Sequence, residues 1–404
     1  MRASAFIFLP CLAISMVVES SVVRLGVVAS PFFLLIFSVL LGFKVRLKTK
    51  DLASISTVWV VLTLISIALS PLNTYGSGVY LFLYLFSGYF FLLIINGLSR
   101  FQEFDFIWFG LYSYVALNFS LLILGIVNKA EYINGGVFGK ALILKFLGLD
   151  FDRTLPFFAP GFQAYGLMLG VVILSVLFSY PRKISNYKAF SIVACSAWQL
   201  LITDSRGAIV FVLAALILSI FARFFSRGEG RANKLFVSVS LLFSVLFGFA
   251  LYYFNKLLGS SSDLARGGNM LSNRDVIWES AVAFIGKEPW VFIFGGGFGS
   301  HKSYGVMSYY EDLFDGWSGG ENSIITLHNS WLQLLFDTGA VGVLLAIFMM
   351  TRKSLGGNNL FFYSALMFLS LYGASDVMLS PYNILGCFVF LVLVVSPSNR
   401  VVDS

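Results

Sequence analysis

Charge is scarce in this chain. Only 12% of its 404 residues are charged, whereas 58% are apolar, and a soluble domain carries about 25% charged residues. A surface so poor in charge would not stay in water, which excludes an ordinary soluble protein. We therefore expect lipid to surround most of the chain.

Residues that bind metals or take part in redox chemistry are scarce as well. The two histidines, His301 and His328, are too few for a multi-histidine metal site. The cysteines, Cys11, Cys195 and Cys387, lie in apolar runs without metal-type spacing, and we interpret them as packing residues. No Walker motif and no zinc-type cluster of His and Cys occurs, so the sequence predicts neither a metal nor a cofactor.

Long apolar runs are what the chain has instead. A helix that spans a bilayer needs roughly 20 mostly apolar residues, and such windows predict an all-α polytopic membrane protein with about twelve helices. The first window follows Met1-Arg2 and could be a signal peptide, but no clear small-x-small cleavage site follows it, and we keep it as a helix. The windows fall at residues 4–19, 25–43, 52–70, 78–97, 105–127, 161–180, 187–203, 206–225, 234–254, 329–350, 358–376 and 381–396.

The basic residues gather on one side of these windows. If the N-terminus is cytoplasmic, the inner segments hold 16 of the 27 lysines and arginines, whereas the short outer connections at 71–77 and 377–380 hold none. This bias follows the positive-inside rule and predicts that both termini are cytoplasmic. The net charge of +7 would then orient the protein in the membrane and bind anionic lipid headgroups, rather than bind nucleic acid. The inner set is Arg2, Lys44, Arg46, Lys48, Lys50, Arg100, Arg182, Lys183, Lys188, Arg223, Arg227, Arg231, Lys234, Arg352, Lys353 and Arg400.

The predicted topology divides the chain into three parts. Residues 1–254 hold the first nine predicted helices and a smaller outer segment at 128–160, residues 255–328 form a large outer loop, and residues 329–404 hold the last three. Residues 139–148 are too short to span, and their two lysines flank an apolar stripe, which predicts a helix lying on the membrane. The large loop combines glycine, serine, acidic residues and tryptophans, a composition that suits a glycan and suits a membrane interface equally well.

Two arginines could bind an anion. Arg206 lies at the predicted outer joint of two helices. A charge at such a place is energetically costly unless it is hydrated, paired with an opposite charge or needed for function. Arg206 either snorkels to the membrane interface or pairs with Asp204, or it binds an anion, since a guanidinium presents a planar fork of donors suited to phosphate. Arg274 alone would be a solvated loop residue, but a glycine-rich stretch at 287–300 follows it, and such a backbone can pack closely or cradle a small group.

His328 stands where the large loop enters the next helix. A lone histidine at a helix start is more often a capping or packing residue, yet imidazole can take a proton from a hydroxyl near neutral pH. It is therefore the natural candidate for a general base. Asp337 lies about 13 Å deeper along the helix, too far to orient His328 directly, and we interpret its role as structural or undetermined.

Together these pieces resemble the bacterial O-antigen ligase and polymerase family. His328-Asn329, nine residues, and then Gly339-Ala340-Val341-Gly342 are similar to the family pattern His-[Asn/Ser/Gln]-x9-Gly-x-x-[Gly/Thr/Tyr]. Ser205-Arg206-Gly207 resembles the Ser-Arg-Gly segment of that family. The resemblance covers about residues 190–350. The family's Arg…Trp…Pro…Gly-x-Gly stretch is matched by Arg274, Trp278, Pro289, Gly295, Gly297 and Gly299.

The resemblance implies a metal-independent, inverting, GT-C-like glycosyltransferase of the bacterial inner membrane. Its donor would be a glycan on undecaprenyl diphosphate at the periplasmic face. Arg206 and Arg274 would stabilise the leaving diphosphate, and His328 would deprotonate the acceptor hydroxyl. Arg153 and Asn329 are secondary candidates, and the segment around Arg153 lacks the Gly and Asn of the family pattern.

The same motifs serve two activities. A polymerase, which we favour, adds the growing chain to the next lipid-linked repeat unit, whereas a ligase adds the finished chain to lipid A-core. The expected partners are the undecaprenyl-diphosphate-linked oligosaccharide, an acceptor glycan or lipid A-core, the bilayer and a chain-length regulator protein.

Two other classes of membrane protein compete with a transferase. A polysaccharide or lipid transporter or flippase fits the helix count, but we find no halves with matching interrupted helices, and the only charges assigned to mid-helix positions are Asp337 and Asp376. A purely structural membrane protein would not need arginines and a histidine at outer helix joints.

Overall fold

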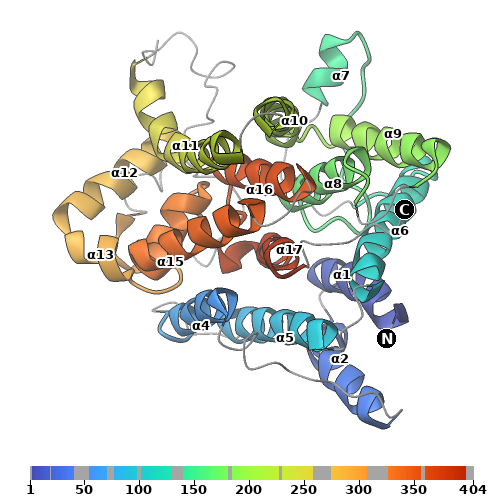
Figure 1. The fold of residues 1–404 in the computed structure, drawn as a ribbon, viewed down its shortest axis with the longest axis horizontal. Helices are drawn as coiled ribbons and strands as arrows, with labels where there is room; N and C mark the ends of the chain where they lie inside the picture. The colour runs from blue at the N-terminus through green and yellow to red at the C-terminus, as the bar shows by residue number, and fades with distance from the viewer. Residues whose placement is uncertain are drawn as a thin grey trace.

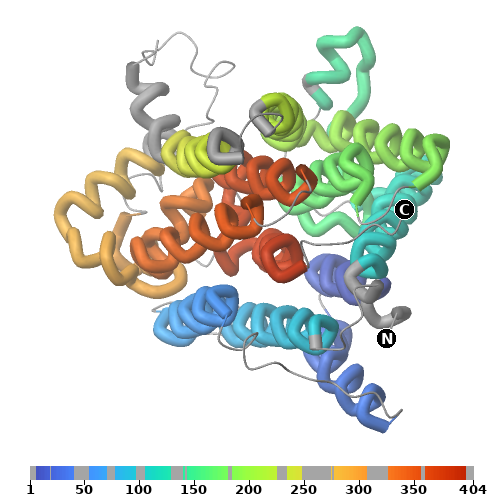
Figure 2. Tube along the Cα trace, viewed as in Figure 1, coloured from blue at the N-terminus to red at the C-terminus, as the bar shows by residue number. Residues whose placement is uncertain are grey.

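The computed structural model describes residues 2–18, 20–40, 54–70, 77–97, 102–128, 140–180, 184–226, 230–257, 274–306, 326–355 and 360–396. Within these ranges the fold is all-helical, apart from two isolated β-bridges, Val127 to Pro156 and Lys140 to Asp152. Figure 1 shows the arrangement, and the path of the chain can be followed in Figure 2. The helices are α1 (Arg2–Val17), α2 (Ser21–Leu40), α4 (Ile55–Ala68), α5 (Ser77–Gly97), α6 (Gln102–Ile123), α7 (Leu142–Phe146), α8 (Phe162–Leu177), α9 (Asn186–Ile202), α10 (Arg206–Ser226), α11 (Gly230–Leu257), α12 (Arg274–Lys287), α13 (Pro289–Phe294), α14 (Ser300–Ser303), α15 (Ser330–Leu355), α16 (Leu360–Gly373), the 3₁₀ turn η5 (Pro381–Asn383) and α17 (Ile384–Val395).

Every apolar window of the sequence overlaps a helix of the structure. Helices satisfy their own backbone hydrogen bonds, which is why apolar segments in lipid adopt them. The chain is a polytopic membrane protein, with five helices among the described residues that are long and apolar enough to cross a bilayer and further apolar helices that are shorter. The five are Ser21–Leu40, Gly78–Asn96, Asp105–Ile123, Arg206–Phe224 and Ser330–Leu355.

The last three long helices form the centre of the fold. Nearly every described side chain of α16 and α17 is buried, and both pack beside α15. Figure 1 shows α8, α9 and α10 on one side of this group and α4 and α5 on another, with α12 and α13 at the edge beside α15. Several serines inside the helices bond their hydroxyls to a backbone carbonyl one turn earlier, as Ser38 does to Leu34 at 2.6 Å, which satisfies these hydroxyls within the helix.

The outer segment at 140–160 holds the short helix α7. The side chains of Phe146 and Leu147 are 90% and 62% exposed, while Leu144 packs with Ile202 at the end of α9. A helix therefore occurs within residues 139–148, as the sequence predicts, and its exposed apolar residues are of the kind found at a membrane surface.

The structure departs from the sequence reading in α15, which is not one continuous helix. Gly339 has φ +69 and ψ −174, a backbone conformation open almost solely to glycine, and it separates an N-terminal from a C-terminal helical stretch. The glycine-rich segment at 295–299 passes through the break. A Cβ on Gly339 would lie 2.6 Å from the backbone nitrogen of Gly295, and a Cβ on Gly295 would lie 2.6 Å from that of Gly339. Two backbones approach here more closely than side chains would permit.

The glycine-rich segment also satisfies the backbone groups that the break exposes. The Phe336 carbonyl accepts a hydrogen bond from the Gly296 N–H at 2.8 Å, and the Asp337 carbonyl accepts one from the Ser66 hydroxyl of α4 at 2.7 Å. Both carbonyls would bond within α15 if the helix continued. The glycines of the family pattern thus have a structural role, because they let one segment dock into a broken helix.

We predict that Gly339→Ala strongly destabilises the protein. The new methyl group would meet the backbone of the glycine-rich segment, and alanine would be forced into a conformation that costs on the order of 1–3 kcal/mol. The check is the thermal midpoint of the purified protein in detergent. Gly26→Ala is the control, because a Cβ at Gly26 meets nothing within 4 Å in the helical α2, and its midpoint should stay level or rise slightly. Equal midpoints for the two variants would contradict this account.

Candidate functional site

The connection between α16 and α17 runs across the start of α15. The Asp376 carbonyl accepts hydrogen bonds from the Ser330 N–H at 3.1 Å and from the Ser330 hydroxyl at 2.8 Å. The Ser330 hydroxyl in turn accepts one from the Met378 N–H at 2.6 Å. Ser330 therefore fixes the backbone of the connection at Asp376, directly above the N-terminus of α15.

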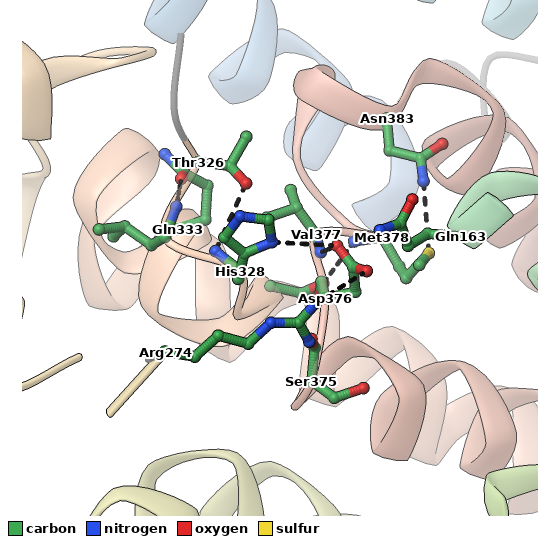
Figure 3. Close-up of polar contacts among 12 residues, drawn as sticks. Gln163, Arg274, Thr326, His328, Gln333, Ser375, Asp376, Val377, Met378 and Asn383 are labelled. Atoms are coloured by element: carbon green, nitrogen blue, oxygen red, sulfur yellow. Dashed lines mark hydrogen bonds and ion pairs between the residues drawn. The ribbon is translucent and has the colours of Figure 1, made fainter. Parts of the chain in front are cut away.

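The Asp376 side chain lies between Arg274 and His328 (Figure 3). The Arg274 Nη2 is 3.8 Å from one carboxylate oxygen, and the His328 Nδ1 is 3.8 Å from the other. Arg274 also donates a hydrogen bond to the Ser375 carbonyl. Two residues that are 54 positions apart in the sequence thus meet through a third that sequence reasoning did not treat as a site residue. We call Arg274, His328 and Asp376 the carboxylate cluster.

His328 is held in an unusual backbone conformation. Its φ is +48, and only two other non-glycine residues of the described ranges, Ser179 and Asp204, have a positive φ. The carbonyl of the preceding Leu327 accepts a hydrogen bond from the Trp278 indole at 2.8 Å, and the Leu327 N–H donates to Gln333 at 3.1 Å. Strained residues of this kind cluster at functional sites and persist only where the surroundings fix them.

Asn329 caps α15. Its side-chain oxygen accepts hydrogen bonds from the backbone N–H groups of Trp331 at 2.9 Å and Leu332 at 3.2 Å, and the residue is fully buried. Asparagine is among the best N-cap residues because it satisfies donors that a helix start leaves unpaired. His328 therefore carries the imidazole, and the adjacent Asn329 is the N-cap that fixes the position of His328 at the start of α15. The structure gives Asn329 this structural role.

Opposing effects act on the Asp376 carboxylate. Burial by itself raises the pKa of Asp376, because it disfavours the charged form, but the neighbouring His328 and Arg274 more than offset this effect. The pKa of Asp376 is thereby lowered below its ordinary value. The His328 Nδ1 is buried and, among the described residues, has no hydrogen-bond partner, because 3.8 Å is too long for a hydrogen bond to Asp376.

Arg206 begins α10 beside this cluster. Its Nε is 3.4 Å from a carboxylate oxygen of Asp204, and its side chain is 55% exposed. The next residue, Gly207, faces the α16 end, where a Cβ would lie 3.1 Å from the Tyr372 ring and 3.3 Å from the Ser375 hydroxyl. The start of α10 thus lies against the connection that carries Asp376. Among the described residues, no hydrogen bond or ion pair joins Arg206 directly to Arg274 or His328. The sequence analysis named the pairing of Arg206 with Asp204 as the structural alternative to anion binding.

Arg153 approaches the same helix joint from the outer segment. Its Nε donates to the Thr203 carbonyl at 2.9 Å, and its guanidinium stacks 3.6 Å above the Phe162 ring. The side chain therefore connects the end of α9 with the start of α8. Close by in sequence, Asp150 and Asp152 are a pair of loop carboxylates of the Asp-x-Asp kind, and the prediction of no metal wrongly took such pairs to be absent. Both lie 3.1 Å from the Lys140 Nζ, and these ion pairs account for them.

A second buried carboxylate, Asp337, joins three segments below the cluster. One of its oxygens accepts hydrogen bonds from the Gly299 N–H at 3.2 Å and the Gln333 side-chain amide at 2.9 Å, and the other accepts one from the Ser380 hydroxyl at 2.7 Å. Gln333 also contacts the buried ring of His301 at 3.3 Å. Asp337 thus holds the glycine-rich segment and the α16–α17 connection on α15, in keeping with the structural interpretation of the sequence.

Of the residues singled out in the sequence, the structure brings Arg274 and His328 together and places Arg206 and Arg153 at the adjoining helix joint. Sequence reasoning missed Asp376. The apolar window predicted as a helix extended to residue 376, so Asp376 was interpreted as a charge within a helix. In the structure α16 ends at Gly373, so Asp376 lies in the connection. In the described ranges, no group of three or more His, Cys, Asp or Glu residues gathers as a metal site would require.

Comparison with known proteins supports the family resemblance. Residues 190–347 match a family model described as O-antigen ligase. The match confirms the resemblance read from the motifs and covers Arg206, Arg274 and His328, but Asp376 and Arg153 lie outside it. No curated protein and no solved structure matches the chain.

We predict that Asp376 stabilises the protein in a pH-dependent manner. Because the pKa of Asp376 is lower in the folded than in the unfolded state, its contribution is present above the ordinary carboxyl range and is lost as the pH falls through the folded-state pKa. The thermal midpoint of the wild type should therefore fall on acidification below about pH 4, and the midpoint of Asp376→Asn should depend less on pH there. Asp150→Asn is the control, because the Asp150 carboxylate is 72% exposed. Identical pH profiles for wild type and Asp376→Asn would refute the assignment.

Proposed function

We propose that this protein is a membrane glycosyltransferase that uses a glycan linked to undecaprenyl diphosphate as its donor. The observation that carries the proposal is the carboxylate cluster, in which a histidine and an arginine from the matched family region share one buried carboxylate. A structural protein has no need to hold a strained histidine beside a guanidinium, since both cost stability.

The contacts also favour one side of the membrane for this chemistry. The ends that meet around the cluster are the starts of α8, α10, α15 and α17 and the ends of α9 and α16. If each apolar window spans the bilayer once, giving twelve spans as in a GT-C-like fold, all of these ends lie on the same side. Under the positive-inside bias that side is the periplasm, and both termini lie in the cytoplasm of a bacterial inner-membrane protein.

In this proposal His328 is the general base. Its Nδ1 faces Asp376, which leaves Nε2 to take the proton of the acceptor hydroxyl. The acceptor oxygen forms a bond to the anomeric carbon of the donor as the bond from that carbon to the diphosphate breaks, and the bonding electrons leave with the diphosphate. One displacement of this kind inverts the anomeric centre. Asp376 fixes the direction of the imidazole and stabilises the imidazolium that results.

Arg274 and Arg206 would receive the diphosphate. A leaving diphosphate needs positive charge more than it needs a proton, and guanidinium groups supply both charge and paired donors. Arg274 is anchored by Asp376 and the Ser375 carbonyl, which limits the motion of its side chain. Arg206 is half exposed, so an anion can reach it while Asp204 holds its Nε edge. Arg153 is a candidate for a supporting role at the same joint, and the proposed reaction uses no metal.

The acceptor decides between two reactions. We place repeat-unit polymerisation first, with an acceptor glycan on a second lipid and a chain-length regulator protein as a partner. Ligation to lipid A-core is the second candidate, and the description of the matched family as a ligase favours it. A transporter or flippase is the alternative from another class, and against it the buried carboxylate of Asp337 in α15 is taken up by hydrogen bonds that hold segments together.

The direct test is an assay with the purified protein in vesicles, a lipid-diphosphate-linked repeat unit as donor and either the same lipid-linked unit or lipid A-core as acceptor. Longer lipid-linked glycans identify a polymerase, and glycosylated lipid A-core identifies a ligase. Movement of the donor across the bilayer without any new glycosidic bond would overturn the proposal in favour of a transporter.

His328→Ala should abolish transfer while the protein still inserts and folds. Loss of a general base lowers turnover by on the order of 10²–10⁴-fold. Product formation over time in the vesicle assay measures this loss, and the elution volume and thermal midpoint of the variant show whether it is folded. Near-normal turnover of a folded His328→Ala protein would rule out the general-base role.

Arg206→Lys should impair transfer by at least about tenfold, because an ammonium cannot reproduce the paired donors of a guanidinium and a hydrogen bond to a charged group contributes about 1.5–3 kcal/mol. The matched control is Arg223→Lys, at the opposite end of the same helix, which should leave turnover unchanged. If both variants turn over like the wild type, Arg206 only pairs with Asp204.

A further inference from the structure

The large outer loop contains apolar side chains that nothing in the described protein covers. In α13, Val291 is fully buried, but Trp290, Phe292, Ile293 and Phe294 are 44%, 48%, 50% and 72% exposed. Four such residues in a helix of six make a continuous apolar surface, and a surface of this kind on a loop in water would be a liability. Where α13 lies relative to the bilayer therefore decides what covers it.

The helix α15 provides a depth scale. Its inner end is marked by Arg352 and Lys353, and Lys353 donates a hydrogen bond to the Ser396 carbonyl at the end of α17. Asp337 lies 16 residues above Lys353, and Ser380, which bonds Asp337, lies 16 residues above Ser396. Counted at 1.5 Å per residue through the break at Gly339 and the turn η5, each path corresponds to a rise of about 24 Å.

On this scale the glycine-rich segment lies below the outer membrane boundary. The hydrocarbon core is about 30 Å thick, which places Asp337, and with it Gly299, roughly 6 Å inside. Gly339 lies 14 residues above Lys353, a rise of about 21 Å, so the Gly295 backbone that crosses it lies roughly 9 Å inside. Ser330 and the carboxylate cluster lie roughly 5 Å outside the same boundary.

The contacts of residues 274–301 with α15 first move deeper along that helix and then return toward its outer end. Trp278 of α12 bonds Leu327 at the outer end of α15, Gly296 bonds Phe336, Gly295 crosses Gly339, and His301 returns to Gln333. The chain thus descends to the break in α15 and rises again. Since α13 ends at Phe294, directly before Gly295, its last residues are at the deepest point.

The backbone of the descending stretch is satisfied as the hydrocarbon core requires. The Gly295 N–H bonds the Val291 carbonyl at 2.9 Å, and the Phe298 N–H bonds the Ser66 carbonyl at 3.0 Å. The Phe298 carbonyl accepts a hydrogen bond from the Ser70 hydroxyl at 2.6 Å. Non-helical backbone is tolerated at membrane depth only where protein groups bond it in this way.

The charges of the stretch occur where it meets the headgroups. Lys287 and Glu288 form the turn between α12 and α13, and both are exposed. The Trp290 indole donates to the Glu288 carboxylate at 2.8 Å, which leaves its ring to the apolar side. A tryptophan with a polar contact on one edge and an apolar face on the other is typical of the membrane interface.

We propose that α13 and Gly295–Gly299 form a re-entrant segment that enters the leaflet on the side of the carboxylate cluster, with Phe292, Ile293 and Phe294 against lipid acyl chains. The part of the large loop that carries α13 is then bound to the membrane rather than extended into water. This inference concerns depth alone and holds whether or not the protein transfers glycans.

Spin labelling tests the depth directly. The three cysteines are replaced by alanine, and single cysteines are introduced as Phe294→Cys and Phe292→Cys, labelled with a nitroxide and reconstituted in vesicles. Accessibility to oxygen, which concentrates in lipid, is compared with accessibility to a water-soluble nickel chelate. Ile217→Cys, on an exposed position of α10, is the lipid control, and Asp150→Cys, on the outer segment, is the water control.

Labels at residues 292 and 294 should resemble the label at Ile217, with high oxygen accessibility and nickel accessibility several-fold below that at Asp150. Nickel accessibility equal to that at Asp150 would overturn the proposal, because the apolar surface would then face water. Low accessibility to both reagents would overturn it as well, because a protein partner would then cover the surface. If one labelled variant fails to fold, the other carries the test.

Discussion

The shared carboxylate of Asp376 is the interaction on which the rest of the site depends. Alone, a buried carboxylate would be costly, and so would a partly buried guanidinium beside an imidazole. Each group makes the others tolerable, and together they tie the start of α12, the approach to α15 and the end of α16. Because these elements come from distant parts of the chain, the charges at the site also fix how the helices close around it.

Asp337 has a different role from Asp376 although both are buried carboxylates. Asp376 faces a guanidinium and an imidazole, whereas Asp337 accepts hydrogen bonds from a backbone amide, a side-chain amide and a hydroxyl. One is suited to orient groups that meet a substrate, and the other is suited to hold backbone in place. The glycine break in α15 connects the two roles, since the segment that fills the break bonds Asp337 and leads on towards α14.

The sequence was sufficient to predict the helices and the family, because apolar windows and a spaced His-Asn…Gly pattern are local signals. It also identified Arg274 and His328 as candidate site residues. It could not predict Asp376, since no local pattern tells whether a charge that ends an apolar run belongs to the helix or to the connection after it. Nor could it predict that α15 breaks at Gly339, because the break depends on a second backbone that arrives from another part of the chain. Arg206 had two readings in the sequence, and its pairing with Asp204 shows that a structural contact and an open, exposed guanidinium can coexist.

The α16–α17 connection has little spare length. Ser330 holds it at Asp376 and Asp337 holds it at Ser380, and these two anchors lie seven residues apart on α15, a separation of roughly 10 Å along the axis. Four residues of fully extended chain reach at most about 14 Å, and three reach about 10 Å. Shortening the connection by one residue would leave it no slack to reach both anchors, so the spacing of the anchors on α15 sets the minimum number of residues in the connection.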